Sequence, residues 1–240
     1  MRLENIVWST PDPHRLGTFW AAAVGATVMA DSADGFEARL TLSGQAFLDL
    51  CLQPVQHPAD TPPRLHPDLA GGARQADVVG RLLDLGARRA DIGQGDVPWV
   101  VLADPDGNAF CVMEDRGVYV DTGPIAALPL DSADPKRDTD FWAAMTGWIP
   151  GGGTDSSTLR HPGGVGPLLV LCPEPEPWQG PGRIHLDVRP TGNDPDPVQL
   201  VRELGGRVLD WPGAEDKPWT VCADPSGNEF CVLAPAREES

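Results

Sequence analysis

Two short segments each place a histidine and an aspartate two positions apart in stretches typical of β-strands. One reads RLHPDL, around His66 and Asp68, and the other reads RIHLDV, around His185 and Asp187. On a strand, residues i and i+2 share a face, so each imidazole can meet its carboxylate. Such a pair can act as a general acid or base. The alternative is structural: each pair ties a strand to a loop, and Pro67 suggests a sheet edge.

Cysteine is the second reactive residue type. The chain has five cysteines, an odd number at spacings unlike a disulfide framework, so we expect free thiols. Cys172, His185 and Cys231 together form a set that zinc accepts with one position left open. The competing interpretation is simple burial, because free cysteine is among the most buried residue types. Cys111 and Cys231 each follow a phenylalanine in an apolar strand.

The sequence repeats itself. WVVLADPDGNAFCV begins at Trp99 and WTVCADPSGNEFCV at Trp219, a spacing of 120 residues (219 − 99). DPHRLGTFWAAAVG begins at Asp12 and DPKRDTDFWAAMTG at Asp134, a spacing of 122 (134 − 12). These spacings predict two copies of one unit, residues 1–117 and 124–236, with a linker around 116–123.

Each copy contains a finer repeat. Four segments with apolar residues at helical spacing each end at a glycine suited to a left-handed helix cap. We predict helices over 13–24, 75–85, 136–146 and 195–204. The glycines define a module of about 60 residues, made of a strand, a helix and several strands. DPDGN and DPSGN predict tight hairpin turns, since no helix follows them to complete a phosphate site.

Tryptophans fall into two groups. Trp20 and Trp142, and likewise Trp99 and Trp219, occupy equivalent positions of the two copies, which predicts core packing. Trp148, Trp178 and Trp211 have no counterpart in the first copy. They could stack on a flat ligand, or they could fill the second copy's cavity or its linker.

The FWAA helix, the His-x-Asp strand and the D-P-x-G-N-x-F-C-V end strand, each present twice, resemble the vicinal oxygen chelate (VOC) superfamily, in its glyoxalase-like and bleomycin-resistance branch. The resemblance implies an α+β fold of two tandem VOC domains. Each domain would contain two βαβββ modules that form a cupped mixed β-sheet, with the helices outside. A chain with four modules would be a monomeric pseudo-dimer or would pair further as a homodimer.

The resemblance also identifies the positions that hold a divalent metal in other members. In the first copy they carry Asn5, Gln53, His66 and Cys111, and in the second Ala127, Cys172, His185 and Cys231. Neither set contains a carboxylate, which the usual ligand set of the superfamily includes. We therefore expect no cofactor and no usual metal site, and a ring-cleaving dioxygenase is disfavoured. The set of Cys172, His185 and Cys231 keeps a zinc enzyme open as a lesser alternative.

Composition limits the partners. The chain has 35 acidic and 18 basic residues and a net charge of −17, which argues against nucleic acid and anionic membranes. The N-terminus lacks the character of a signal peptide, and no apolar run approaches the roughly 18 residues needed to span a bilayer. We expect a cytoplasmic protein. No dinucleotide or P-loop fingerprint is present.

Three functions fit these observations. The first is a binder of a small organic molecule, with a sequestering, resistance or accessory role. The second is a metal-independent lyase or isomerase that uses His66 with Asp68, or His185 with Asp187. The third is a duplicate in which one copy has lost its site. Asn5, Gln53 and His66 keep more polar character, which favours the first copy as the working one.

Overall fold

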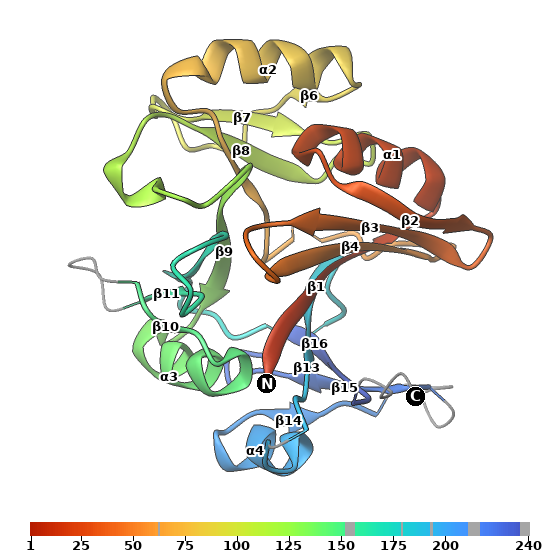
Figure 1. The fold of residues 1–240 in the computed structure, drawn as a ribbon, viewed down its shortest axis with the longest axis vertical. Coiled ribbons are helices and arrows are strands. Elements are labelled where there is room, and N and C mark those ends of the chain that lie inside the picture. Colours follow the sequence, from red (N-terminus) through yellow and green to blue (C-terminus); the bar gives the residue numbers. More distant parts are fainter. Residues whose placement is uncertain (62, 152–156, 179, 193, 211–216, 236–240) are drawn as a thin grey trace.

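The structure is a computed structural model, and it describes residues 1–240 apart from 62, 152–156, 179, 193, 211–216 and 236–240. Four βαβββ modules follow one another along the chain (Figure 1). The first contains β1 (Arg2–Thr10), α1 (Pro13–Val24), β2 (Thr27–Ser32), β3 (Gly35–Thr41) and β4 (Phe47–Pro54). The second contains β5 (Asp68–Ala70), the 3-10 turn η1 (Gly72–Arg74), α2 (Gln75–Asp84), β6 (Arg88–Arg89), β7 (Val100–Ala103) and β8 (Ala109–Met113).

The second half repeats this order after the short turn η2 (Gly117–Tyr119). The third module contains β9 (Ile125–Ser132), α3 (Pro135–Thr146), β10 (Ile149–Pro150), β11 (Thr158–Arg160) and β12 (Leu168–Pro173). The fourth contains β13 (Ile184–Arg189), α4 (Pro197–Glu203), β14 (Arg207–Val208), β15 (Trp219–Ala223) and β16 (Glu229–Leu233).

The four helices begin and end within two residues of the predicted positions. The Asp12 carboxylate caps α1 by accepting from the Arg15 backbone N–H at 3.0 Å, and Asp134 caps α3 in the same way. Gly25 and Gly147 follow these helices with φ of 71° and 70°, a left-handed conformation that costs glycine little. The predicted ends of α2 and α4 differ from the observed ones by one or two residues.

The modules form two eight-stranded mixed sheets, and each sheet combines both sequence copies. Sheet A has the order β14-β15-β16-β13-β1-β4-β3-β2, from the fourth and first modules. Sheet B has the order β10-β11-β12-β9-β5-β8-β7-β6, from the third and second modules. The α+β class and the tandem repeat are confirmed. The pairing of modules differs from the expectation that the two modules of one copy form one sheet. Each sheet is instead built from one module of each copy, as in a dimer formed within a single chain.

The join of sheet A lies between β1 and β13, which run antiparallel with Val7 opposite His185 and Asn5 opposite Asp187. The first strands of all four modules present similar edges, so pairing within or across copies would satisfy the same backbone groups. The segments that connect consecutive modules decide which of these two pairings forms. Residues 55–67, which are rich in proline, carry the chain from sheet A to sheet B, and residues 174–183 carry it back.

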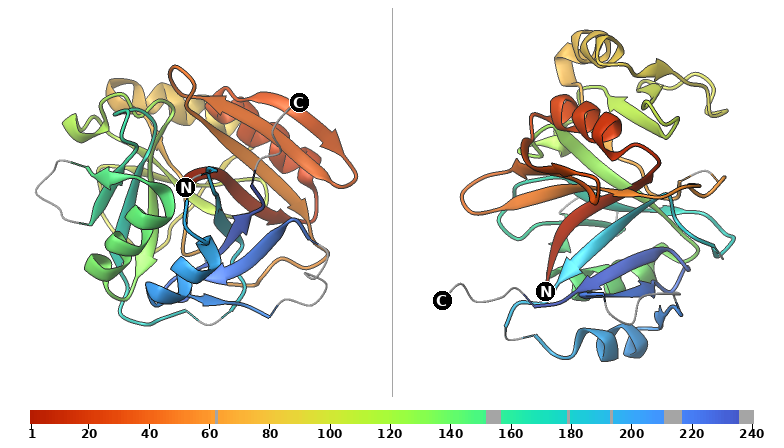
Figure 2. Two further views of the ribbon diagram at one scale, coloured as in Figure 1. Left: turned by 60° about the horizontal axis from the view of Figure 1, so that its bottom comes forward. Right: turned by 90° about the vertical axis from the view of Figure 1, so that its right-hand side faces the viewer.

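The core lies between the two sheets. On α1, the ring of Trp20 lies 5.2 Å from that of Trp8 in sheet A and 5.1 Å from that of Phe110 in sheet B. Trp142 on α3 contacts Phe230 of sheet A in the same way, with the ring centroids 5.2 Å apart. Both tryptophans are buried, as predicted. α2 and α4 lie at opposite ends of the long axis (Figures 1 and 2).

No helix in the described part of the chain combines the length and apolar character needed to cross a membrane.

Candidate functional site

Strand β13 brings the second His-x-Asp pair to the face of sheet A that lies opposite the core. Its alternate residues Ile184, Leu186 and Val188 pack in the core. His185 and Asp187 therefore point to the other face, as period-two alternation requires. Cys231 on the neighbouring strand β16 lies beside Asp187 in the parallel ladder. We call His185, Asp187 and Cys231 the A cluster.

Three polar atoms converge in the A cluster. His185 Nε2 lies 3.4 Å from Asp187 Oδ1 and 3.6 Å from Cys231 Sγ. Asn5 on β1 donates from Nδ2 to the other carboxylate oxygen, Asp187 Oδ2, at 2.8 Å. Asp187 Oδ1 and His185 Nδ1 are buried without a hydrogen-bond partner. Asn5 thus fixes the carboxylate and leaves Oδ1 directed at the histidine and the thiol.

The electrostatics of the A cluster favour a protonated imidazole. Burial lowers the pKa of His185, but the Cys231 and Asp187 side chains outweigh it and raise the pKa well above its usual value. Burial raises the pKa of the Cys231 thiol. The arrangement is not a catalytic triad, because the thiol and the carboxylate both lie at Nε2 rather than at opposite nitrogens of the ring.

The A cluster borders a cavity of about 900 Å³, which we call cup A. Asp187 and Cys231 line cup A, and His185 lies behind them, with only 4% of its side chain exposed. The first module supplies the facing wall. The described lining comprises Asn5, Asp34, Gly35, Phe36, Glu37, Cys51, Leu52, Gln53, Pro54, Asp187, Arg189, Lys217, Pro218, Trp219, Cys231, Leu233, Ala234 and Pro235.

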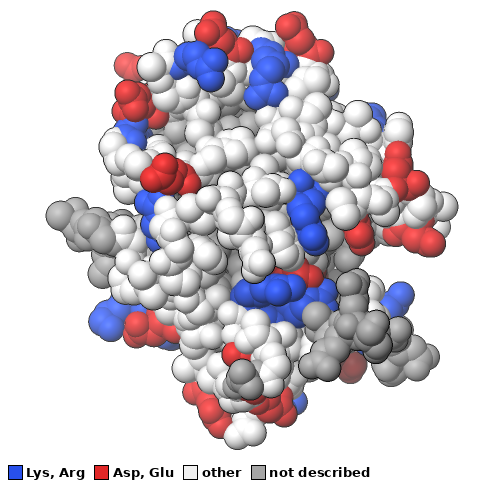
Figure 3. Space-filling view, viewed as in Figure 1, with Lys and Arg blue, Asp and Glu red and all other residues white. Residues whose placement is uncertain are grey.

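Charges of both signs meet in and around cup A. Arg189 binds Glu4 at 2.6 Å, and Arg39 holds Asp49 through two contacts of 2.8 and 2.7 Å. Lys217 lies 5.4 Å above the Trp219 ring. Burial, and then the nearby carboxylates led by Asp187, raise the pKa of the Cys51 thiol. Basic side chains lie over the middle of the face that carries β1, β3 and β4, and acidic ones lie mostly at its margins (Figure 3).

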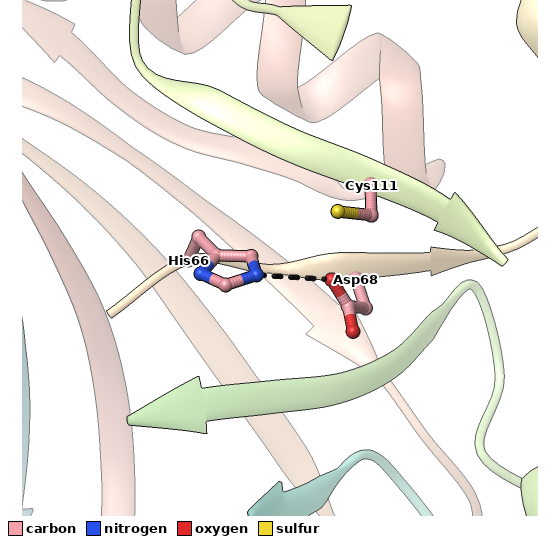
Figure 4. A group of neighbouring side chains, drawn as sticks. All are labelled: His66, Asp68 and Cys111. Atoms are coloured by element: carbon pink, nitrogen blue, oxygen red, sulfur yellow. Dashed lines mark ion pairs between the residues drawn. The ribbon is translucent and has the colours of Figure 1, made fainter. Parts of the chain in front are cut away.

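Sheet B contains an equivalent group, His66, Asp68 and Cys111, which we call the B cluster (Figure 4). His66 Nε2 lies 3.3 Å from Asp68 Oδ1, which is buried without a hydrogen-bond partner. Because Pro67 interrupts the pair, β5 begins only at Asp68, and the His66 side chain is 28% exposed.

The linker between the copies packs over the B cluster. Tyr119 contacts the small apolar group formed by Cys111, Met113 and Ala126. Burial raises the pKa of the Tyr119 phenol, Arg116 opposes this rise, and the Asp68 carboxylate adds to it. We call the side of sheet B that carries Cys111, Met113 and Ala126 cup B; Trp99, Val101 and Tyr119 pack against these residues there.

The structure regroups the residues singled out in the sequence. Asn5 and Gln53 of the first copy lie in cup A with Asp187 and Cys231 of the second, whereas His66 and Cys111 lie in sheet B. The proposal that one copy holds a working site by itself is therefore replaced by sites shared between copies. Cys172 lies on β12 of sheet B, so the structure does not bring it to His185 and Cys231 in sheet A.

Of the unpaired tryptophans, Trp148 and Trp178 do not belong to the described lining of cup A. Trp148 is buried, 6% exposed, and packs in the core. Trp178 lies near Arg64, whose guanidinium is 6.0 Å from its ring. Trp211 lies outside the described residues. The tryptophan in the described lining of cup A is Trp219, which sequence reasoning assigned to the core because it has a counterpart in the first copy.

Other residues of cup A were missed, among them Glu37, Arg189 and Lys217. A signal for the first two was present, because each lies at an alternate position of a strand whose other face is apolar. Across sheet A, the four positions that hold metal in related folds carry Asn5, Gln53, His185 and Cys231. These positions contain no carboxylate, so they do not match the usual set. The carboxylate of the site is Asp187.

Comparison with known proteins identifies the family to which this chain belongs. A family model described as a glyoxalase-like domain matches residues 5–113 and again 127–233. The chain belongs to the glyoxalase-like domain family, within the VOC superfamily. No functionally curated protein matches this glyoxalase-like chain.

Several solved structures resemble almost the whole length of the glyoxalase-like chain. A mutant of glyoxalase I from Zea mays has 17% identity and a TM-score of 0.61, over 97% of this chain and 92% of that one. Unmodified glyoxalase I from Zea mays has 16% identity and a TM-score of 0.59, over 97% and 92%. A putative dioxygenase from Bacillus subtilis has 15% identity and a TM-score of 0.57, over 98% and 85%. At these identities the likeness shows the fold alone.

Proposed function

We propose that this glyoxalase-like protein binds a small organic molecule in cup A. The observation that supports this is a cavity of about 900 Å³ whose described lining combines apolar side chains with polar and charged ones. Phe36, Trp219 and Leu233 supply apolar surface, and Asn5 and Asp187 supply hydrogen-bonding atoms. The volume lies within the range of small-molecule sites in proteins.

The role that fits best is sequestration, resistance or an accessory function. The four positions of the usual VOC metal site carry no carboxylate in either sheet, so the usual metal-held base is missing from them. Binding in cup A needs no catalytic group. Because the cup draws on the first and fourth modules, the proposed binding unit is the whole chain.

A lyase or isomerase is the second candidate, favoured by one observation. Asp187 lines cup A, and His185 behind it has a raised pKa, so the pair holds a proton beside the cavity at neutral pH. Such a pair can deliver a proton to a bound molecule through Asp187. Turnover of a bound ligand that is lost in Asp187→Asn, while binding survives, would favour this candidate over simple binding.

The test uses an apolar fluorescent probe, anilinonaphthalene sulfonate, with the intact chain. We expect saturable binding that Trp219→Ala weakens. Trp178→Ala is the matched control, because Trp178 does not belong to the described lining of cup A, and this variant should bind the probe as the wild type does. Each variant is first checked for a cooperative thermal transition. Unchanged affinity in Trp219→Ala would refute binding in cup A, and a loss confined to Trp178→Ala would move the site to that side chain.

A further inference from the structure

The contact between His185 and Asp187 in the A cluster is too long for a good hydrogen bond. An N–H···O hydrogen bond typically spans about 2.7–3.2 Å, whereas His185 Nε2 and Asp187 Oδ1 are 3.4 Å apart. Nε2 also lies 3.6 Å from Cys231 Sγ, yet a single ring nitrogen carries at most one proton to share between them. Two acceptor groups thus approach one ring nitrogen, and Asp187 Oδ1 stays unpaired.

The same distances fit the edges of a metal coordination tetrahedron. Zinc binds histidine nitrogen and carboxylate oxygen at about 2.0–2.1 Å and thiolate sulfur at about 2.3 Å. Ligand atoms at these distances and at the tetrahedral angle are separated by about 3.3–3.4 Å for N and O and about 3.6 Å for N and S. The A cluster shows 3.4 Å and 3.6 Å, and His66 Nε2 lies 3.3 Å from Asp68 Oδ1 in the B cluster.

The surroundings of Asp187 resemble those of a metal ligand. Asn5 donates to Oδ2 at 2.8 Å and so orients the carboxylate with Oδ1 toward the histidine and the thiol. Outer hydrogen bonds of this kind commonly orient the ligands of metal sites. All three ligand atoms of each cluster lie within 4.8 Å of one another.

We propose that the A and B clusters each bind a transition-metal ion of the zinc class through one histidine, one aspartate and one cysteine. This donor set departs from the usual one of the fold. It takes its carboxylate from the residue two positions after the histidine and leaves the positions of Gln53 and Cys172 unused. A mixture of thiolate, imidazole and carboxylate selects zinc-like ions over magnesium or calcium.

The two sites differ in their surroundings. Asp187 and Cys231 line cup A, so water or an atom of a cup ligand can complete the coordination there. The B cluster is covered by Tyr119, and Ala127 stands opposite Asp68 where Asn5 stands opposite Asp187. The B site lacks an Asn5 counterpart, and we expect it to bind the ion more weakly.

The experiment is a titration of chelator-treated full chain with Co²⁺ alone, followed by thiolate-to-metal absorption in the near ultraviolet and by the ion content per chain. We expect two ions per chain, bound in two steps. Cys231→Ser should remove the tighter step and Cys111→Ser the weaker one. The matched control is Cys222→Ser, because Cys222 packs in the core on the opposite face of sheet A from Cys231, and this variant should bind two ions.

Asn5→Ala keeps every ligand and tests the geometry without removing a donor. It should weaken the A site by about 10–100-fold and leave the B site unchanged. Absence of the charge-transfer band in the folded wild type would overturn the proposal. A serine variant that binds as much ion as the wild type would overturn it for that cluster. Because only the metal is added, the outcome does not depend on whether cup A binds an organic molecule.

Discussion

Trp20 Nε1 donates a hydrogen bond of 3.2 Å to Asp104 Oδ2, which lies 84 residues further along the chain. In the second copy, Trp142 Nε1 donates to Asp224 Oδ2 at 3.1 Å. Each bond joins the FWAA helix to the D-P-x-G-N turn of the same copy, so the two repeated motifs are partners. The bonds lie between the sheets and hold together two modules that do not share a sheet.

We expect Trp20→Phe to destabilise the protein. The substitution keeps an aromatic ring but removes one donor from the fully buried Asp104 carboxylate, a loss of about 1–3 kcal/mol. Trp142→Phe should have a similar effect at Asp224. Urea unfolding of the two variants and the wild type measures the difference. A change below about 0.5 kcal/mol, the range of ordinary surface substitutions, would contradict the role given to these bonds.

Asp224 should make stability depend on pH. Burial, with the Asp138 carboxylate contributing, raises the pKa of Asp224 to about 6, against the N–H groups that donate to it. A carboxyl whose pKa is higher in the folded than in the unfolded state favours folding while it is protonated. Its contribution to stability therefore falls as pH rises from about 4 through about 6.

The measurement is the free energy of unfolding at several pH values between 4 and 8, for the wild type and for Asp224→Asn. The variant removes the titrating group, so the difference between the two proteins should change across this window. A difference that stays constant with pH would show that Asp224 does not titrate there.

Comparing the matched variants Asp187→Asn and Asp68→Asn tests which cup binds the organic molecule. Asp187 lines the cavity, whereas Asp68 lies under the linker, so we expect only the first substitution to alter the affinity for an apolar probe. Fluorescence titration of both folded variants checks this. An effect confined to Asp68→Asn would assign binding to cup B.

Tyr119→Ala should create a second binding site. The phenol packs on Cys111, Met113 and Ala126, and its removal leaves an apolar hollow in cup B. We expect the number of anilinonaphthalene sulfonate molecules bound per chain to rise, while the affinity at cup A stays unchanged. An unchanged stoichiometry in a variant that still unfolds cooperatively would show that other side chains close cup B.

The sequence was sufficient for the elements and for the internal repeat. Gly25 and Gly147 end helices because left-handed backbone is a local property. The His-x-Asp spacing predicted a shared strand face for the same reason. Module pairing is not local: β1 could pair with β5 or with β13, and helix and strand periodicity are the same in both cases. Cys172 was therefore grouped with His185, although the two lie in different sheets.

The internal repeat alone also could not predict that Trp219 lines a cavity. A position that recurs in both copies suggests a common structural task, yet Trp99 lies near Tyr119 in cup B and Trp219 lines a cavity. The difference arises from the linker 116–123, whose Tyr119 packs in cup B. Only residues 234 and 235 of the corresponding segment after β16 are described, and both belong to the wall of cup A.

The exchange of modules between the copies has a consequence for how this gene can change. Each sheet takes one module from each copy, so each cup needs residues from both. Selection that maintains a cup therefore acts on both copies. A mutation that unfolds the N-terminal copy removes Asn5 and Gln53 from beside Asp187 as surely as one in the C-terminal copy removes Asp187 itself. The duplication has therefore made the two copies depend on each other, and neither copy is redundant.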